Sequence, residues 1–292
     1  MQLNRRHFAF GLALTPFAGI RVANADEPRG LFWTATPPGK PPSVLFGYAR
    51  TAAAATAGIV RDGNRFAAQA RRLKGDVANF QMPPISMSHD LLQPIVGRVS
   101  PALAERIRAV LDKSFPSVPA KEKLSGFEVI ILLMGEGQTP PQPSVGGTIV
   151  EHAQAAGKPI DYLVSADEVK AAYHPPDIPA LDKHIDENVL NYLLTLRDTA
   201  GPIGKYQEGL YAARRTADLG KVTAEMKAHG VPSIVDLLPT ATLEGTIIDR
   251  AVQTVKGAQD QMFLLLPVGT LTRPGGILSK MKDSGVEISP LA

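Results

Sequence analysis

The 292-residue chain contains no cysteine, and this absence removes several kinds of chemistry. Disulfides, thiolate metal ligands and a cysteine nucleophile are all excluded. No Gly-x-Ser-x-Gly sequence is present, so the nucleophile elbow of α/β-hydrolases is excluded as well. Gly146-Gly147-Thr148 is too short for a phosphate-binding loop. Beyond the N-terminal segment, no apolar run is long enough to span a bilayer.

The chain also lacks an excess of charge once its N-terminal segment is set aside. Residues 1–25 contain three arginines and no acid, and removing these from the 31 basic residues leaves 28, equal to the 28 acidic residues. The pI near 9.0 therefore arises from the N-terminal segment. The remaining chain has no electrostatic basis for binding nucleic acid or an anionic membrane.

The N-terminus has the features of an export signal. Arg5 and Arg6 precede an apolar run from Phe8 to Ile20, which is shorter than a membrane span. Ala23 and Ala25 supply small residues at the positions that signal peptidase reads. The paired arginines resemble a twin-arginine signal. The general secretory route and an uncleaved anchor are the alternatives.

We expect residues 1–25 to be a signal peptide and residues 26–292 to form one periplasmic or secreted domain. Short apolar runs alternate with helical patterns, which indicates an α/β (α+β) fold. We expect a central mixed sheet formed by the N- and C-terminal halves. Residues 185–230 are mainly helical in pattern, and they predict a helical insertion or cap.

Individual elements follow from apolar spacing and from capping residues. Ser100-Pro101 predicts a helix start, and Ser165 with Glu168 predicts a capping box. A helix is expected from the alanine-rich stretch after Ala52 to Leu73. Phe127–Met134 fits either a strand or a buried helix, because periodicity cannot separate the two. The expected strands are Gly30–Ala35, Ser43–Gly47, Asp76–Met82, Pro159–Val164, Phe263–Gly269 and Val286–Ile288.

Two distant stretches share a pattern that points to a site. In each, an apolar strand ends at a glycine and a polar residue follows three positions later: Gly47 with Arg50, and Gly269 with Thr272. One stretch lies near each end of the chain. The sequence therefore predicts a cleft to which both halves contribute.

Four stretches in this order resemble the TraB/GumN family, which includes the Tiki metalloproteases. The resemblance covers roughly residues 30 to 290 and implies an α/β fold with a divalent-metal site for hydrolysis. The family holds its metal with two Gly-x-x-His histidines and nearby acids, which leave one position open for water. The stretches are Leu31-Phe32-Trp33 with Ser43–Gly47, Ala153–Leu163, Tyr206–Leu210, and Val268-Gly269 with Pro274–Leu278 and Gly285-Val286.

The residues that the resemblance would make metal ligands are replaced. Arg50 and Thr272 stand where the family has histidines, and Gln81 and Val164 stand where it has glutamates. Arginine is a permanent cation and cannot ligate a metal. The other three side chains carry no charge to balance a divalent ion. The sequence therefore predicts a degenerate metal site, with no catalytic residue, metal ligand or cofactor assigned.

The leading hypothesis is an exported, non-catalytic binding or scaffolding protein. Its partner would be a peptide, a protein or a small anionic ligand. An arginine buried at a strand end binds carboxylate or phosphate through its planar fork. An internal salt bridge of that arginine is the alternative. The candidate cleft positions are Gly47, Arg50, Gln81, Gly269 and Thr272.

Two other functions remain open from the residues alone. The chain could be a hydrolase or peptidase of the TraB/GumN type that uses non-standard residues such as His174, His184 or Asp167, with a divalent metal. His174 and His184 flank a proline-rich loop with several aspartates, which is also what a solvated loop looks like. A structural periplasmic protein without a ligand is the third possibility.

Overall fold

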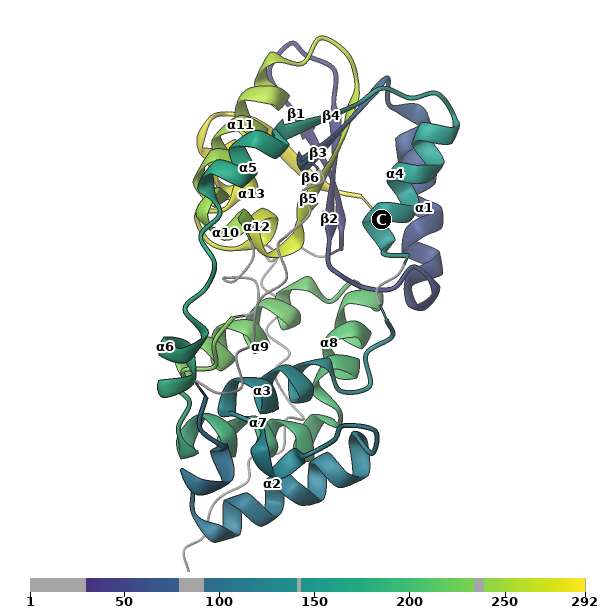
Figure 1. The fold of residues 1–292 in the computed structure, drawn as a ribbon. Coiled ribbons are helices and arrows are strands. Elements are labelled where there is room, and N and C mark those ends of the chain that lie inside the picture. Colours follow the sequence, from purple (N-terminus) through teal and green to yellow (C-terminus); the bar gives the residue numbers. More distant parts are fainter. Residues whose placement is uncertain (1–29, 79–91, 141–142, 234–238, 292) are drawn as a thin grey trace, which may run out of the picture.

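The computed structural model describes residues 30–78, 92–140, 143–233 and 239–291. The chain forms an α/β layer stacked on a layer of helices (Figure 1). No helix among the described residues is both long and apolar enough to cross a lipid bilayer. The expected signal peptide, with Arg5, Arg6, Ala23 and Ala25, lies outside the described residues, as do Gln81 and the end of the strand predicted over Asp76–Met82.

The expected mixed sheet is confirmed, and both halves of the chain contribute to it. Its six strands have the order β4-β3-β5-β2-β1-β6. The strands β4, β3, β5 and β2 run parallel, whereas β1 is antiparallel to both β2 and β6. The strands are β1 (Phe32–Thr36), β2 (Ser43–Tyr48), β3 (Arg72–Val77), β4 (Ile160–Val164), β5 (Met262–Pro267) and β6 (Glu287–Pro290).

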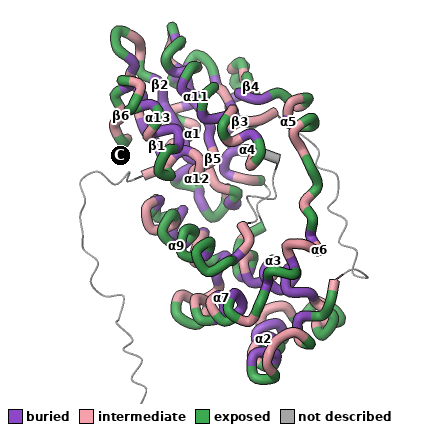
Figure 2. The backbone as a smooth tube through the Cα atoms, turned by 90° about the vertical axis from the view of Figure 1, so that its left-hand side faces the viewer, coloured by how far each residue is buried: buried purple, intermediate pink, exposed green. Residues whose placement is uncertain are grey.

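Helices cover both faces of the sheet (Figure 1). One face packs against α1 (Ala57–Gln69) and α4 (Val145–Ala155). The other packs against α5 (Ala166–Ala172), α11 (Glu244–Gly257), α12 (Val268–Thr272) and α13 (Ile277–Asp283), and the short α10 (Pro239–Thr242) contacts α5 and α11. Side chains alternate along β2 accordingly, so Phe46 joins the first apolar cluster and Leu45 joins the second. The central strands β2 and β5 are almost wholly buried, whereas the edge strands β4 and β6 are partly exposed (Figure 2).

The helical layer has an apolar core of its own, which includes Ile107, Phe127 and Leu190. Residues 185–230 lie in this layer together with helices that come earlier in the chain. Because α8 and α9 contact the α/β layer, they place the helical layer beneath the strand ends. The helices are α2 (Pro101–Ser114), α3 (Gly126–Gly135), α6 (Ile178–Lys183), α7 (Glu187–Ala200), α8 (Ile203–Ala212) and α9 (Thr216–Ala228).

Buried ion pairs tie the helical layer together. Asp182 accepts hydrogen bonds from the Arg98 guanidinium and, at 2.8 Å, from the backbone N–H of Phe127. Arg197 forms a two-pronged pair with Glu136, with both N···O distances at 2.7 Å. Burial raises the pKa of Glu136, but hydrogen bonds from Arg197 and Ser114 outweigh it and hold the pKa below its usual value.

The segment that fitted either a strand or a helix is α3. Ser125 caps it, because its hydroxyl accepts from the Glu128 N–H at 3.2 Å. The Glu128 carboxylate in turn accepts from the Ser125 N–H at 2.8 Å. This reciprocal capping box fixes the helix start. The expected box at Ser165 and Glu168 is confirmed at the start of α5.

Several predicted boundaries are wrong, each for a local reason. The helix predicted to reach Leu73 ends at Gln69, because Leu73 belongs to β3 and faces the core. Strand β5 ends at Pro267, and Gly269 lies in α12 rather than at a strand end. Ser100 precedes α2 as predicted, but its hydroxyl donates to Glu187 Oε1 at 2.6 Å instead of capping the helix.

Candidate ligand site at the carboxyl edge of the sheet

The two predicted strand-end stretches meet at one edge of the sheet. Strands β2 and β5 are parallel neighbours, and Tyr48 lies opposite Pro267 at their carboxyl ends. The chain leaves β2 toward α1 on one face and leaves β5 toward α12 and α13 on the other. Open α/β sheets bind ligands where neighbouring strands connect to opposite faces. This edge is therefore the candidate site.

Arg50 lies in the loop after β2, and its side chain is exposed rather than buried as predicted. It forms no ion pair with any acid in the part of the chain that the structure describes. Its backbone carbonyl accepts a hydrogen bond from Gln138 Nε2 at 3.4 Å. Its positive charge acts on the nearby Tyr48 phenol and partly offsets the rise in that group's pKa, which burial dominates. The guanidinium therefore remains available at the strand ends.

The other predicted positions serve packing rather than ligand chemistry. Gly47 is buried, and a Cβ there would lie 3.1 Å from Val268 and 3.2 Å from Leu271, so glycine lets α12 approach β2. The Thr272 hydroxyl donates to the Val268 carbonyl at 2.9 Å within α12. Gly269 lies within the first turn of that helix. Of the predicted positions that the structure describes, Arg50 has the side chain best suited to bind a ligand.

Sequence reasoning missed a buried pair next to Arg50. The Tyr48 hydroxyl donates to Asp76 Oδ2 at 2.7 Å, and this bond joins β2 and β3 across the end of β5. Asp76 is only 5% exposed. Burial raises its pKa above the usual value, although the Tyr48 hydrogen bond opposes the shift. Burial also raises the pKa of the Tyr48 phenol, and the neighbouring Asp76 carboxylate adds to this.

A second missed acid, Glu208, lies on α8. Its Oε2 accepts from the Thr139 hydroxyl at 3.2 Å, whereas its Oε1 is buried without a hydrogen-bond partner among the described residues. One turn later, the Tyr211 hydroxyl donates to the Gly47 carbonyl at 3.1 Å. The face of α8 that carries Glu208 and Tyr211 therefore lies against the edge of the sheet. In the sequence, Glu208 stands at helical spacing from apolar residues, and this pattern could have identified it as an acid that faces the core.

The proposed histidine and aspartate cluster does not form a metal site. His174 and His184 are both exposed. Asp177 and Asp186 accept backbone N–H groups at the starts of α6 and α7. Among residues 30–78, 92–140, 143–233 and 239–291, no three His, Asp or Glu side chains are grouped as a metal ion would need. Asp177 and Asp186 instead begin helices, and Asp182 within α6 pairs with Arg98.

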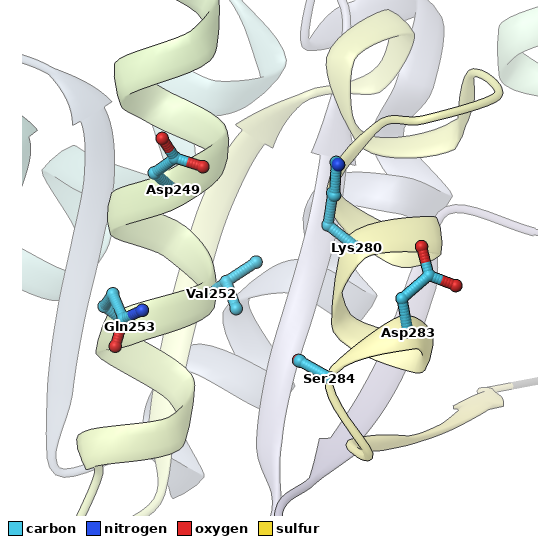
Figure 3. A pocket seen from close by; sticks show the side chains of 6 residues that line it. All are labelled: Asp249, Val252, Gln253, Lys280, Asp283 and Ser284. Carbon is cyan, nitrogen blue, oxygen red and sulfur yellow. The ribbon is translucent and has the colours of Figure 1, made fainter.

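A surface groove of about 460 Å³ lies elsewhere, between α11 and α13 (Figure 3). Its polar side chains do not converge, since Asp249 and Gln253 project from one helix and Asp283 from the other in different directions. The groove therefore lacks a common point that a polar ligand could contact. Its lining residues are Asp249, Val252, Gln253, Lys280, Asp283 and Ser284.

No protein-family model, curated protein or solved structure matches this chain. The carboxyl edge combines an exposed guanidinium at Arg50 with the start of α4, where Ala52 and Ser144 form a β-bridge. The first turn of α4 has no acidic residue. An exposed guanidinium without an acidic partner suits an anion, although the buried carboxylates of Asp76 and Glu208 lie near the same edge.

Proposed function

We propose that this chain is an exported binding protein of the TraB/GumN type that takes an anionic ligand at the carboxyl edge between β2 and β5. One observation carries the proposal: Arg50 is exposed at the switch point and has no acidic partner among the described residues. Arg61 and Arg72 of the α/β layer also have no acidic partner among the described residues, whereas Arg250 pairs with Glu168 and Arg273 with Glu244. Arg50 is distinguished by its position at the strand ends. The N-terminal arginines and small residues support export.

Arginine is chemically suited to this role. Its planar guanidinium binds carboxylate or phosphate through two parallel hydrogen bonds, and it stays charged at every physiological pH. The start of α4 lies beside the Arg50 loop, but its first amides are already bonded, because Val145 N–H donates to the Thr51 carbonyl and Gly147 N–H to the Ser144 hydroxyl. Because Arg50 has no competing acid among the described residues, an incoming anion does not have to displace an ion pair.

The residues at this edge do not fit a divalent metal. A guanidinium offers no lone pair, and the Thr272 hydroxyl is committed to a carbonyl within its own helix. Asp76 is the carboxylate at the end of β3, and it is already bonded to Tyr48. Three protein ligands are typical of a catalytic metal site. We therefore assign no metal-dependent step to this edge.

The test is calorimetric titration of the purified protein with propionate and with inorganic phosphate. We expect one site, and we expect Arg50→Gln to weaken binding by at least about tenfold, because it removes a charged hydrogen bond. The matched control is Arg61→Gln, which changes an exposed arginine on α1 and should leave the affinity unchanged. Binding should also weaken as salt is added.

Two outcomes would count against the proposal. Absence of binding by either anion, or equal affinity in wild type and Arg50→Gln, would remove Arg50 as the contact. A parallel titration with Mn²⁺ or Co²⁺ addresses the alternative function. One tightly bound ion per chain would favour a metal-dependent hydrolase that uses residues other than those at this edge.

A further inference from the structure

The loop that carries Arg50 is held in place by the chain between α3 and α4. Ala52 and Ser144 form an antiparallel β-bridge, and a backbone hydrogen bond of 2.9 Å lies on each side of it. The side-chain amide of Gln138 donates to the Arg50 carbonyl at 3.4 Å. We call the described part of this chain, residues 136–140 and 143–144, the connector. The connector fixes the backbone from which the Arg50 guanidinium projects.

Helix α8 contacts both the connector and the end of β2 through polar side chains. The Glu208 carboxylate accepts from the Thr139 hydroxyl at 3.2 Å and from the Thr139 N–H at 3.5 Å. One turn later, the Tyr211 hydroxyl donates to the Gly47 carbonyl at 3.1 Å. Helix α8 therefore bonds to both segments that determine where the Arg50 backbone lies.

Glu208 is buried with its hydrogen bonding incomplete. The residue is 9% exposed, and its buried Oε1 has no hydrogen-bond partner among the described residues. A buried acid that is only partly paired costs stability, which an apolar side chain of similar size would not. Local features that lower stability are expected where function requires them. Because Oε1 is buried, a ligand does not reach it, and any contribution of Glu208 to binding is indirect.

From these contacts we propose that Glu208 is a positioning residue of the anion site, which acts on Arg50 through the connector. Its bond to Thr139 orders the connector, and the connector orders the Arg50 loop before an anion arrives. A site that is held in its binding geometry binds more tightly, because less conformational entropy is lost on binding. The inference rests on the proposed anion site and names what sets the affinity of that site.

The experiment uses two substitutions that separate the charge of Glu208 from its hydrogen bond. Glu208→Gln removes the charge and keeps an acceptor for Thr139, whereas Glu208→Met removes both and fills a similar volume. Phosphate and propionate are titrated calorimetrically into wild type and each variant. We expect Glu208→Gln, the conservative variant, to bind them no more weakly than wild type, because it loses a negative charge near the anion. We expect Glu208→Met to bind them at least about threefold more weakly.

Two further measurements distinguish positioning from a general loss of structure. Urea denaturation should show that Glu208→Met is no less stable than wild type, since it removes a buried acid whose pairing is incomplete. Amide hydrogen exchange in this variant should be at least about threefold faster at Ala53 and Val145, whose N–H groups donate beside the β-bridge. Glu122→Met, at an exposed acid of the helical layer, is the control and should change neither affinity nor exchange.

A second variant tests the same bond from the connector. Thr139→Val removes the hydroxyl that donates to Glu208 and leaves the charge of the acid in place. It should weaken anion binding and speed exchange at Ala53 and Val145 as Glu208→Met does. This variant decides the question if Glu208→Met does not fold.

The outcomes separate this inference from the proposed function. If anions bind through Arg50 but Glu208→Met and Thr139→Val bind them as tightly as wild type, the inference is wrong and the anion site stands. The same holds if Glu208→Gln binds as weakly as Glu208→Met, or if binding weakens only in step with stability. If neither anion binds to wild type, or if binding does not depend on Arg50, both the positioning role and the anion site are overturned.

Discussion

The helical layer and the carboxyl edge of the sheet differ in how their charged side chains are paired. In the helical layer, Arg98 and Arg197 each meet an acid, and each pair gains further hydrogen bonds from backbone or hydroxyl groups. At the edge, Arg50 has no acidic partner in the described part of the chain, and Glu208 keeps one oxygen unpaired. The first arrangement fixes helix packing. The second leaves the Arg50 guanidinium available to a ligand.

The difference follows from what each region has to do. A buried ion pair stabilises a fold only when every donor and acceptor finds a partner. Moving each charged group out of water costs on the order of several kcal/mol. The Glu136 carboxylate meets that condition with Arg197 and Ser114. A binding site is under the reverse constraint, since groups already paired inside the protein are not available to a ligand. The comparison predicts that substitutions in the helical layer cost more stability than those at the edge.

The largest effect is expected for Asp182→Ala in the helical layer. The substitution removes the acceptor of the Phe127 N–H and the acid that pairs with Arg98, whose guanidinium keeps only the backbone carbonyls at positions 182 and 185 as acceptors. Breaking a buried pair in this way should lower the free energy of unfolding by about 3–5 kcal/mol. Urea denaturation followed by circular dichroism measures it. Asp112→Ala is the control, because it removes only the exposed pair with Lys121 and should cost at most about 1 kcal/mol.

A loss of less than about 1 kcal/mol in Asp182→Ala would contradict the comparison. It would mean that the paired groups of the helical layer contribute little to packing. The apolar core alone would then stabilise the helical layer. The charged groups of the helical layer and of the carboxyl edge would not differ in what they contribute to stability.

Much of the fold could be predicted from local sequence, because local features fix it. Ser165 and Glu168 start a helix wherever they lie, and the same spacing at Ser125 and Glu128 would have identified α3 as a helix. The alternation between glycine-bounded apolar runs and helical patterns was enough for the α/β class. A sheet to which both halves of the chain contribute was also predicted, whereas the pairing of β2 with β5 was not.

The site residues could be predicted only in part, because their meaning depends on distant packing. Tyr48 and Asp76 meet because both β2 and β3 pair with β5. Strand β5 lies near the end of the sequence, far from β2 and β3. No local sequence pattern predicts this order of the strands in the sheet. The burial of Glu208 depends on how α8 docks against the sheet. The exposure of Arg50 likewise depends on which helices surround its loop, and its residue type says nothing about that.

An intermediate effect is expected where the two regions touch. Tyr211→Phe removes the hydrogen bond from α8 to the Gly47 carbonyl and leaves that carbonyl buried. The free energy of unfolding should fall by about 0.5–1.5 kcal/mol. Tyr206→Phe on the same helix is the control, and its effect should stay within about 0.5 kcal/mol. Equal effects of the two substitutions would show that this hydrogen bond does not join the layers.

The smallest change in the free energy of unfolding at neutral pH is expected for Asp76→Asn. This change should depend on pH. Burial raises the pKa of Asp76, so the folded state holds its proton more tightly than the unfolded state. The stabilisation that protonated Asp76 gives the folded state is therefore fully present below the ordinary aspartate pKa of about 3.9. It is lost as the pH rises through the raised pKa of the folded state. Asparagine still accepts from Tyr48 and does not titrate.

The stability of Asp76→Asn relative to wild type should therefore increase between pH 4 and pH 7, with a difference within about 1 kcal/mol at neutral pH. Urea denaturation at both pH values measures it. Tyr48→Phe should act in the opposite sense, because it leaves the ionised carboxylate without its donor at neutral pH. A difference between Asp76→Asn and wild type that is the same at both pH values would mean that Asp76 keeps its usual pKa. The carboxyl edge would then resemble an ordinary hydrated surface, and its contrast with the helical layer would rest on Glu208 alone.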